Sequence, residues 1–124
     1  MKKILIIEDE KLLADLLAKK LGDQKYEVRV VGDGGEGLQA VREFRPDLLL
    51  LDIILPHKDG FSILEEIRKD ESVKATPVVI ISNSGQPVEI SRGEQLGVKD
   101  WCIKVNFNPS EVLEKVKQQI GEAK

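Results

Sequence analysis

The sequence predicts an α/β fold, in which helices pack on both faces of a parallel β-sheet. Three short runs, at 4–7, 48–51 and 78–81, consist only of aliphatic residues, which is typical of strands that are buried on both faces. Longer segments with apolar residues at helical spacing separate these runs, so strands and helices alternate along the chain. A chain of 124 residues is long enough for one such domain with a buried core.

Strand–helix repeats can be assigned in chain order. The second predicted strand alternates apolar and polar residues, as an edge strand does, and the fifth is short. The predicted strands span residues 2–7, 26–31, 48–51, 78–81 and 100–103. The predicted helices that follow them span residues 10–21, 38–44, 61–67, 86–96 and 109–120. The helix at 86–96 is the least regular, because Gly93 lies inside it.

The first predicted helix contains more leucines than one core face needs. Leu12 is expected to lie to one side, near the acidic residues that precede the helix, and Gly22 is expected to cap the helix. We interpret Leu12 as part of a docking patch for a helical partner; the alternative is an incidental surface leucine. The leucines expected to face the core are Leu13, Leu16, Leu17 and Leu21.

Composition and charge argue against several classes of protein. A net charge of -3 disfavours a nucleic-acid-binding domain, which usually carries a basic stripe. No apolar run approaches the ~20 residues of a membrane span, and the first residues lack a secretory signal pattern. The single cysteine, Cys102, fits a reducing compartment, so we expect a cytoplasmic protein. One cysteine and one histidine, His57, are too few for a structural zinc site.

Polar groups follow four of the predicted strands at the point where each strand stops. Glu8 and Asp9 follow the first strand, and Asp52 follows the third. Ser82 follows the fourth strand, and Lys104 follows the fifth. In open parallel sheets the carboxyl ends of the strands form the ligand-binding edge. These side chains are therefore expected to lie close together.

The acids among these residues would repel one another unless they share a cation. Carboxylates without a neighbouring histidine or cysteine favour a hard ion, and Mg²⁺ is the leading candidate because it needs few protein carboxylates. Lys104 adds a second positive charge, and Ser82 adds a hydroxyl donor. A carboxylate nucleophile, a Mg²⁺ site, a lysine and a hydroxyl are the groups that phosphoryl transfer to an aspartate requires.

Several motifs carry these groups in a fixed order along the chain. They are Ile6-Ile7-Glu8-Asp9-Glu10, Asp52-Ile53-Ile54-Leu55-Pro56 through Asp59-Gly60, Ile80-Ile81-Ser82, and Gly97-Val98-Lys99-Asp100-Trp101 with Lys104. With these motifs the chain resembles, over almost its whole length, the receiver domains of two-component response regulators, and among them the chemotaxis regulators. The resemblance implies a flavodoxin-like (βα)5 domain with strand order 2-1-3-4-5, covering residues 1–124 with no effector domain.

The resemblance also assigns roles to the acidic residues. Asp52 would be the phosphoacceptor. Asp9 and Asp52 would bind Mg²⁺ directly, together with the main-chain carbonyl of Ile54. Glu8 would act on the metal mainly through a bound water.

Lys104 would contact the phosphoryl group, and Ser82 would hydrogen-bond it and move on activation. Trp101 would be a second switch residue whose ring moves; the alternative is a ring that stays in one place as packing. The chain departs from the family pattern at Val105, where proline usually follows the lysine, so we expect no cis peptide there. It departs again at Asn83, where a smaller residue is usual.

The function implied is that of a switch rather than a metabolic enzyme, because the protein would catalyse only its own phosphorylation and dephosphorylation. A histidine kinase or a histidine phosphotransfer protein would donate the phosphoryl group. The output face would lie at about residues 86–120 and bind a downstream protein, with no direct contact to nucleic acid or membrane. The protein would be a monomer or a phosphorylation-dependent dimer.

Two other functions match parts of the pattern. A receiver-like interaction module that works without phosphate predicts missing site residues, whereas all of them are present. A phosphatase with an aspartyl-phosphate intermediate, of the haloacid-dehalogenase kind, would place a second acid two residues after the nucleophile. Here that residue is Ile54. The phosphorylation switch is therefore the leading interpretation.

Overall fold

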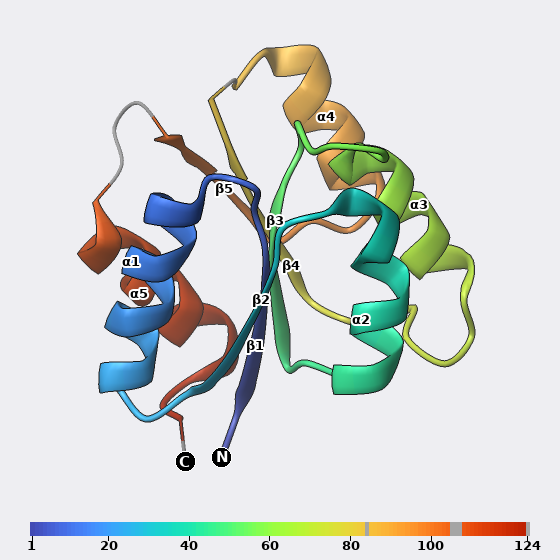
Figure 1. Cartoon of the computed structure of the whole chain (residues 1–124). Helices are drawn as coiled ribbons and strands as arrows, with labels where there is room; N and C mark the ends of the chain where they lie inside the picture. The colour runs from blue at the N-terminus through green and yellow to red at the C-terminus, as the bar shows by residue number, and fades with distance from the viewer. Residues whose placement is uncertain (84, 105–107, 124) are drawn as a thin grey trace.

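The computed structural model describes residues 1–83, 85–104 and 108–123 and shows an open sheet between two layers of helices (Figure 1). Within these residues the five strands are parallel and lie in the order β2-β1-β3-β4-β5, so the predicted fold class and strand order are confirmed. The strands are β1 (Lys3–Ile7), β2 (Glu27–Val31), β3 (Leu48–Asp52), β4 (Val78–Ser82) and β5 (Asp100–Ile103). The helices are α1 (Lys11–Asp23), α2 (Gly37–Phe44), α3 (Gly60–Lys69), α4 (Pro87–Gln95) and α5 (Pro109–Ile120), with a 3₁₀ turn, η1 (Gly34–Glu36), before α2.

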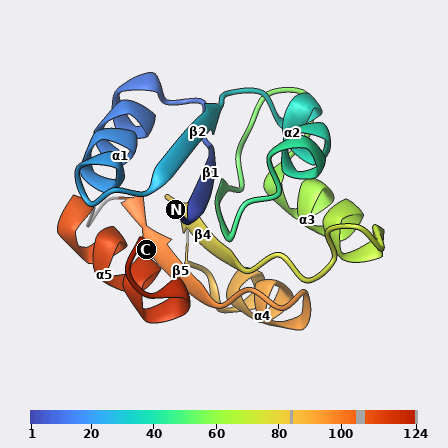
Figure 2. The ribbon, with the colours of Figure 1, turned by 90° about the horizontal axis from the view of Figure 1, so that it is seen from below.

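Helices cover both faces of the sheet. α1 and α5 lie on one face, and α2, α3 and α4 lie on the other (Figure 2). Neighbouring residues of a strand point to opposite faces, so each aliphatic run contributes to both layers. In β1, Ile4 and Ile6 pack in the core cluster of α1 and α5, whereas Leu5 and Ile7 pack in the cluster of α2 and α3. This division explains why the strand runs are apolar at every position.

Helix α1 differs from the prediction in the leucines that it buries. Leu13, Leu17 and Leu21 are buried at four-residue spacing and form one narrow stripe. The expectation that Leu16 faces the core is wrong, because its exposed fraction is 54%, and that of Leu12 is 83%. One residue turns a helix by about 100°, which carries Leu16 away from Leu17 and onto the side of Leu12. Leu12 and Leu16 are four residues apart and therefore lie next to each other on the exposed side of α1.

The end of α1 also differs from the prediction. Gly22 is not the cap, because α1 continues to Asp23 and its C-cap residue is Gln24. Lys25 adopts the left-handed conformation, with φ of 75°, that turns the chain toward β2. The strand then begins one residue later than expected, at Glu27, and Tyr26 is buried just before it.

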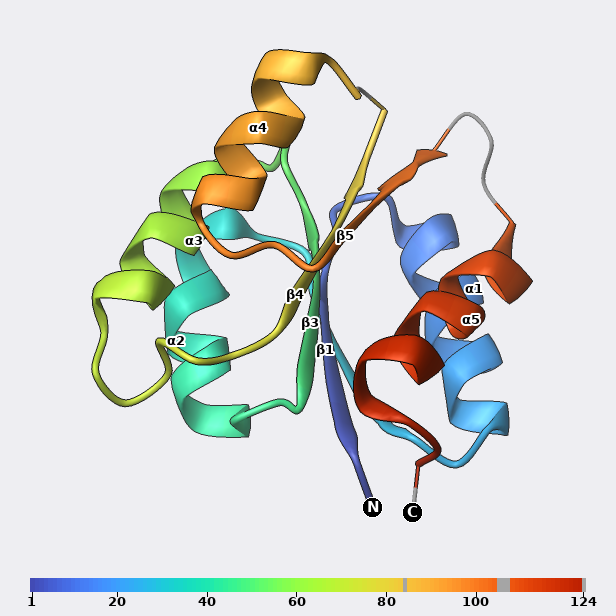
Figure 3. The same ribbon diagram turned by 180° about the vertical axis from the view of Figure 1, so that it is seen from behind.

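The strands all run toward the same edge of the sheet, opposite the N-terminus (Figure 3). The connections from β1 to α1, from β3 to α3 and from β4 to α4 lie at this edge. The ends of β1, β3, β4 and β5 carry the residues that the sequence singled out. In the described part of the chain, no helix has both the length and the apolar character that crossing a membrane would require.

Candidate functional site

The carboxyl edge of the sheet brings three acids together. Glu8 and Asp9 follow β1, Asp52 ends β3, and these two strands pair with each other. One carboxylate oxygen from each residue lies within 4.8 Å of those from the other two. Glu8 and Asp52 are buried, whereas Asp9 is exposed. The cluster is therefore anchored in the protein on one side and open to solvent on the other.

Asp52 is held at the start of the loop that leads into α3. Its Oδ1 accepts a hydrogen bond from the N–H of Ile54 at 3.4 Å, and its Oδ2 lies 2.8 Å from Lys104 Nζ. Gly60, the first residue of α3, donates its N–H to the carbonyl of Ile53 at 2.7 Å. A Cβ on Gly60 would lie 2.2 Å from the carbonyl oxygen of Asp52, so only glycine allows α3 to begin this close to the acid.

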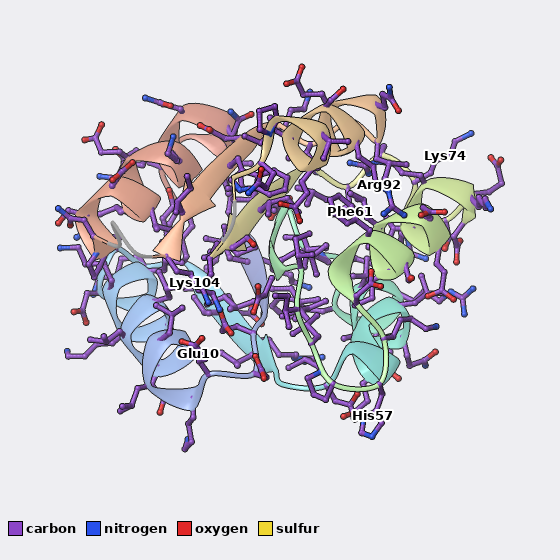
Figure 4. The ribbon with its side chains drawn as sticks, turned by 90° about the horizontal axis from the view of Figure 1, so that it is seen from above. Glu10, His57, Phe61, Lys74, Arg92 and Lys104 are labelled. Atoms are coloured by element: carbon purple, nitrogen blue, oxygen red, sulfur yellow. The ribbon has the colours of Figure 1, made fainter. Side chains whose placement is uncertain are left out.

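The ammonium group of Lys104 lies among the acids and points toward Glu10 (Figure 4). Its Nζ is 2.8 Å from Glu8 Oε1, 2.8 Å from Asp52 Oδ2 and 3.3 Å from Glu10 Oε1. The lysine side chain is 7% exposed, so water screens these ion pairs only weakly. Burial opposes the charge of the ammonium, but the contacts with Asp52 and Glu8 outweigh it and raise the pKa of Lys104. The lysine therefore carries its charge at neutral pH.

Glu8 is the acid whose ionisation depends most on its surroundings. Burial raises the pKa of Glu8 to about 7, and the contact with Lys104 opposes that rise. The N–H of Glu10 also favours the ionised form, because it donates to Glu8 Oε2 at 3.0 Å, whereas the charge of Asp52 disfavours it. Burial of Glu8 thus outweighs its contact with Lys104 in setting its ionisation.

Glu10 belongs to the cluster although no role of its own was predicted for it. It precedes α1 as the N-cap residue, and its side chain is 55% exposed where it meets Lys104. The signal was present in the sequence, because Glu8, Asp9 and Glu10 form an unbroken acidic run at the end of β1. An acid one residue beyond a strand end can still reach the shared edge of the sheet.

The donor set fits a magnesium ion. The ligand atoms that Glu8, Asp9 and Asp52 offer are all carboxylate oxygens, which hard cations prefer. With Glu10, the cluster holds more carboxylates than its one ammonium group can neutralise. The exposure of Asp9 leaves room for the waters that Mg²⁺ keeps when it binds to proteins.

Of the two predicted switch residues, Ser82 lies beside the acids and Trp101 lies on another face. Ser82 is buried at the end of β4, one residue beyond Ile81, which pairs with Asp52. Trp101 is on β5 and packs in the layer of α3 and α4, where its ring centroid is 6.3 Å from that of Phe61. The indole ring therefore does not belong to the acid cluster itself.

Two further expectations concern the loops around the cluster. The side chain of Ile54 is 70% exposed, so this residue contributes its backbone rather than a packed side chain at the loop after β3. The expected absence of a cis peptide after Lys104 concerns Val105, which lies outside the described residues. That expectation stays a prediction.

Comparison with known proteins decides the family. The family model for the response regulator receiver domain matches residues 4–117. The chain belongs to the response regulator receiver domain family. This receiver domain is 34% identical to the DNA-binding response regulator MtrA of Mycolicibacterium smegmatis, over 95% of this chain and 50% of that protein. The receiver domain thus spans about half the length of the curated relatives that it matches.

Solved structures support the same family. The phosphorylated cyanobacterial phytochrome response regulator RcpA is 36% identical, with a TM-score of 0.80 over 94% of this chain and 89% of that one. The receiver domain of the sensor histidine kinase PA1611 from Pseudomonas aeruginosa PAO1 is 26% identical, with a TM-score of 0.85 over 98% of both chains. In that structure a magnesium ion is coordinated in the active-site cleft.

These comparisons confirm the predicted family and its place in two-component signalling. Receiver domains are signalling domains rather than classical enzymes; they bind Mg²⁺ in an acidic pocket and interact with histidine kinases or phosphotransfer proteins. The absence of an effector domain and of direct nucleic-acid contact stay predictions, because MtrA is named as DNA-binding and the match covers half of it.

We predict that Mg²⁺ stabilises the folded receiver domain through the acid cluster. At a concentration about one hundred times its Kd, the ion should add about 2.7 kcal/mol to the free energy of unfolding, because it binds only the folded state. Urea unfolding with and without Mg²⁺ measures this difference. Asp9→Asn should reduce the gain, whereas Asp15→Asn, at an exposed acid on α1 that pairs with Lys11, should keep it. Equal gains in both variants would contradict the assignment.

Proposed function

We propose that this receiver domain is a phosphorylation-driven switch in which Asp52 accepts the phosphoryl group of a phosphohistidine. The observation that carries the proposal is the short contact between Lys104 Nζ and Asp52 Oδ2, 2.8 Å, at the rim of the acid cluster. A buried carboxylate beside a buried ammonium is poised to hold a dianionic group once phosphorylated. The phosphorylated state of RcpA, a 36% identical relative, supports the same chemistry for this chain.

The transfer step forms one bond and breaks one. A carboxylate oxygen of Asp52 attacks the phosphorus atom, the new O–P bond forms, and the P–N bond of the phosphohistidine breaks. The electron pair of that bond stays on the imidazole of the donor, which takes up a proton from solvent. Asp52 needs no general base, because its carboxylate is a nucleophile when ionised.

The residues of the cluster divide the remaining tasks. Asp9, Asp52 and the carbonyl of Ile54 would hold Mg²⁺ directly, and Glu8 would hold it through a water. When bound, the ion offsets negative charge on the phosphoryl oxygens. Lys104 contributes the second positive charge and exchanges part of its contact with Asp52 for a phosphoryl oxygen.

Ser82 reads the phosphorylated state. It lies at the end of β4, the strand next to Asp52, and its hydroxyl would donate a hydrogen bond to the phosphoryl group. The movement of Ser82 and the associated movement of Trp101 would bias the face formed by α4, β5 and α5, at about residues 86–120, between two states. A downstream protein would bind that face in one of the two states.

The side of α1 that carries Leu12 and Leu16 is the docking patch for the phosphoryl donor. These leucines are 83% and 54% exposed, and α1 begins directly after the acidic run, at Lys11. An exposed apolar pair beside a reactive group suits the helices of a histidine kinase or phosphotransfer protein, which can pack against α1 while the phosphohistidine reaches Asp52. The patch thus gives the donor protein an approach to the cluster.

Binding of beryllofluoride, a phosphoryl mimic, tests the proposed function. The wild-type protein should bind it only with Mg²⁺ present, and Asp52→Asn should abolish binding, as measured by ¹⁹F NMR. Asp47→Asn is the matched control, because it makes the same change just before the other end of β3, where Asp47 accepts a hydrogen bond from Lys3 N–H. Beryllofluoride bound to Asp52→Asn, or no binding by the wild type, would reject the proposal.

We further predict that Leu12→Ala slows phosphotransfer from a histidine kinase that phosphorylates the wild-type chain. Loss of an exposed apolar contact at the donor interface should cost about 1 kcal/mol, or roughly fivefold in the transfer rate at low protein concentration. Val88→Ala is the control, because Val88 is 76% exposed but lies on α4. Identical rates for Leu12→Ala and Val88→Ala would remove α1 from the docking model.

A further inference from the structure

Helix α4 carries a glycine at a buried position in its interior. Gly93 lies within the helix Pro87–Gln95, and it is buried. Glycine in a helix interior is unfavourable relative to alanine, because the backbone loses more freedom on folding. A buried helix glycine with ordinary φ therefore suggests that a neighbour needs the space of its missing side chain.

That neighbour is the indole ring of Trp101. A Cβ built on Gly93 would lie 3.1 Å from Trp101 Cζ3 and 3.5 Å from Cε3, closer than a methyl group normally packs against an aromatic edge. The ring is rigid, so it can make room for a methyl group only by moving as a whole. Gly93 thus forms a notch in α4 that receives the distal edge of the indole.

The notch has a second wall that holds the ring in place. Trp101 packs against Phe61 of α3, with ring centroids 6.3 Å apart and ring planes tilted by 42°. Arg92 lies beside Phe61 (Figure 4), with its guanidinium 4.3 Å from the ring centroid. Arg92 Nη2 also pairs with Glu65 Oε1 at 2.6 Å. The seat of the indole therefore joins β5, α3 and α4 in one cluster.

A cavity lies beside the indole ring. It has a volume of about 370 Å³ and borders Trp101 between α4 and β5. Its lining includes the apolar side chains of Ile90 and Val98 and the acid Glu94. A displaced indole would still contact protein in this cavity but would meet more solvent, because the cavity opens to the surface.

We propose that Gly93 is a positioning residue that seats Trp101 and so sets the balance between a seated and a displaced indole on the α4–β5 face. The link from this balance to phosphorylation rests on the proposed function of Asp52. Trp101 is three residues before Lys104 on the same segment, and Lys104 contacts Asp52. The short segment from Trp101 to Lys104 thus connects the indole ring to the acid cluster.

Acrylamide quenching of Trp101, the single tryptophan, tests the seat without any ligand. Gly93→Ala should raise the quenching constant about twofold, because the added methyl shifts the ring toward the displaced place. Gly22→Ala is the matched control, since Gly22 is a helix glycine of α1 whose Cβ would meet nothing within 4 Å. A quenching constant in Gly93→Ala equal to that of the wild type would overturn the proposal.

A rescue variant keeps the test decisive if Gly93→Ala does not fold. The double variant Gly93→Ala, Trp101→Phe should fold, because a phenyl ring does not reach the position of Cζ3. Circular dichroism and thermal unfolding measure the recovery, with Trp101→Phe alone as the reference. If neither Gly93→Ala nor the double variant folds, the proposal that Gly93 seats Trp101 is overturned.

Beryllofluoride with Mg²⁺ tests the link to the acid cluster. In the wild type it should change the quenching constant of Trp101. By linkage, the affinity of Gly93→Ala for beryllofluoride should then differ about fivefold or more from that of the wild type. The affinity should rise if beryllofluoride exposes the ring and fall if it protects the ring. Equal affinities would overturn the link. A wild type that binds no beryllofluoride would instead reject the proposed function, while the ligand-free quenching result stands on its own.

Discussion

The contact of one ammonium group with two buried carboxylates governs the chemistry of this receiver domain. Lys104 Nζ lies 2.8 Å from Glu8 and 2.8 Å from Asp52, in a place where water provides little screening. Buried carboxylates are tolerated when they are paired, and they repel one another when they are not. The lysine makes the cluster compatible with folding; in the proposed function, the remaining negative charge attracts a divalent ion and, through it, a phosphoryl group. Stability and reactivity at this edge therefore have the same physical origin.

The parallel sheet brings Lys104 into contact with Glu8 and Asp52. Strands that run in one direction present their carboxyl ends at one edge, so residues that are far apart in sequence, such as Glu8 and Lys104, meet there. The same arrangement buries each aliphatic strand under helices on both faces and gives the acids a rigid base. The close start of α3 at Gly60 fixes the loop after Asp52 in the same way. Precise placement of the acids thus follows from backbone packing rather than from side-chain contacts alone.

The parts of the structure that could be predicted are those with strong local signals. Unbroken aliphatic runs locate β1, β3 and β4, and a polar residue at the end of each of these runs locates the site edge. The burial of Leu16 was predicted wrongly, because neighbouring leucines share one helical sequence pattern and only contacts with the sheet and α5 decide which stripe is buried. The end of α1 was wrongly predicted at Gly22 because glycine is the usual residue for a left-handed turn. Here the left-handed residue is Lys25, a residue type that does not indicate such a turn. The acidic run at the end of β1 was a signal for Glu10, but its contact with Lys104, like the seat of Trp101 at Gly93, depends on distances between separate elements that the pattern alone does not give.

A double-mutant cycle between Lys104 and Asp52, measured by urea unfolding in the absence of divalent ions, tests the central contact most directly. Lys104→Met should cost about 3 kcal/mol, because it leaves two buried carboxylates without their cation. Adding Asp52→Asn to Lys104→Met should recover more than about 1 kcal/mol of that loss, since it removes one of the two repelling charges. Losses that add to within about 0.5 kcal/mol would mean that the two side chains act independently, and would contradict the shared-charge account.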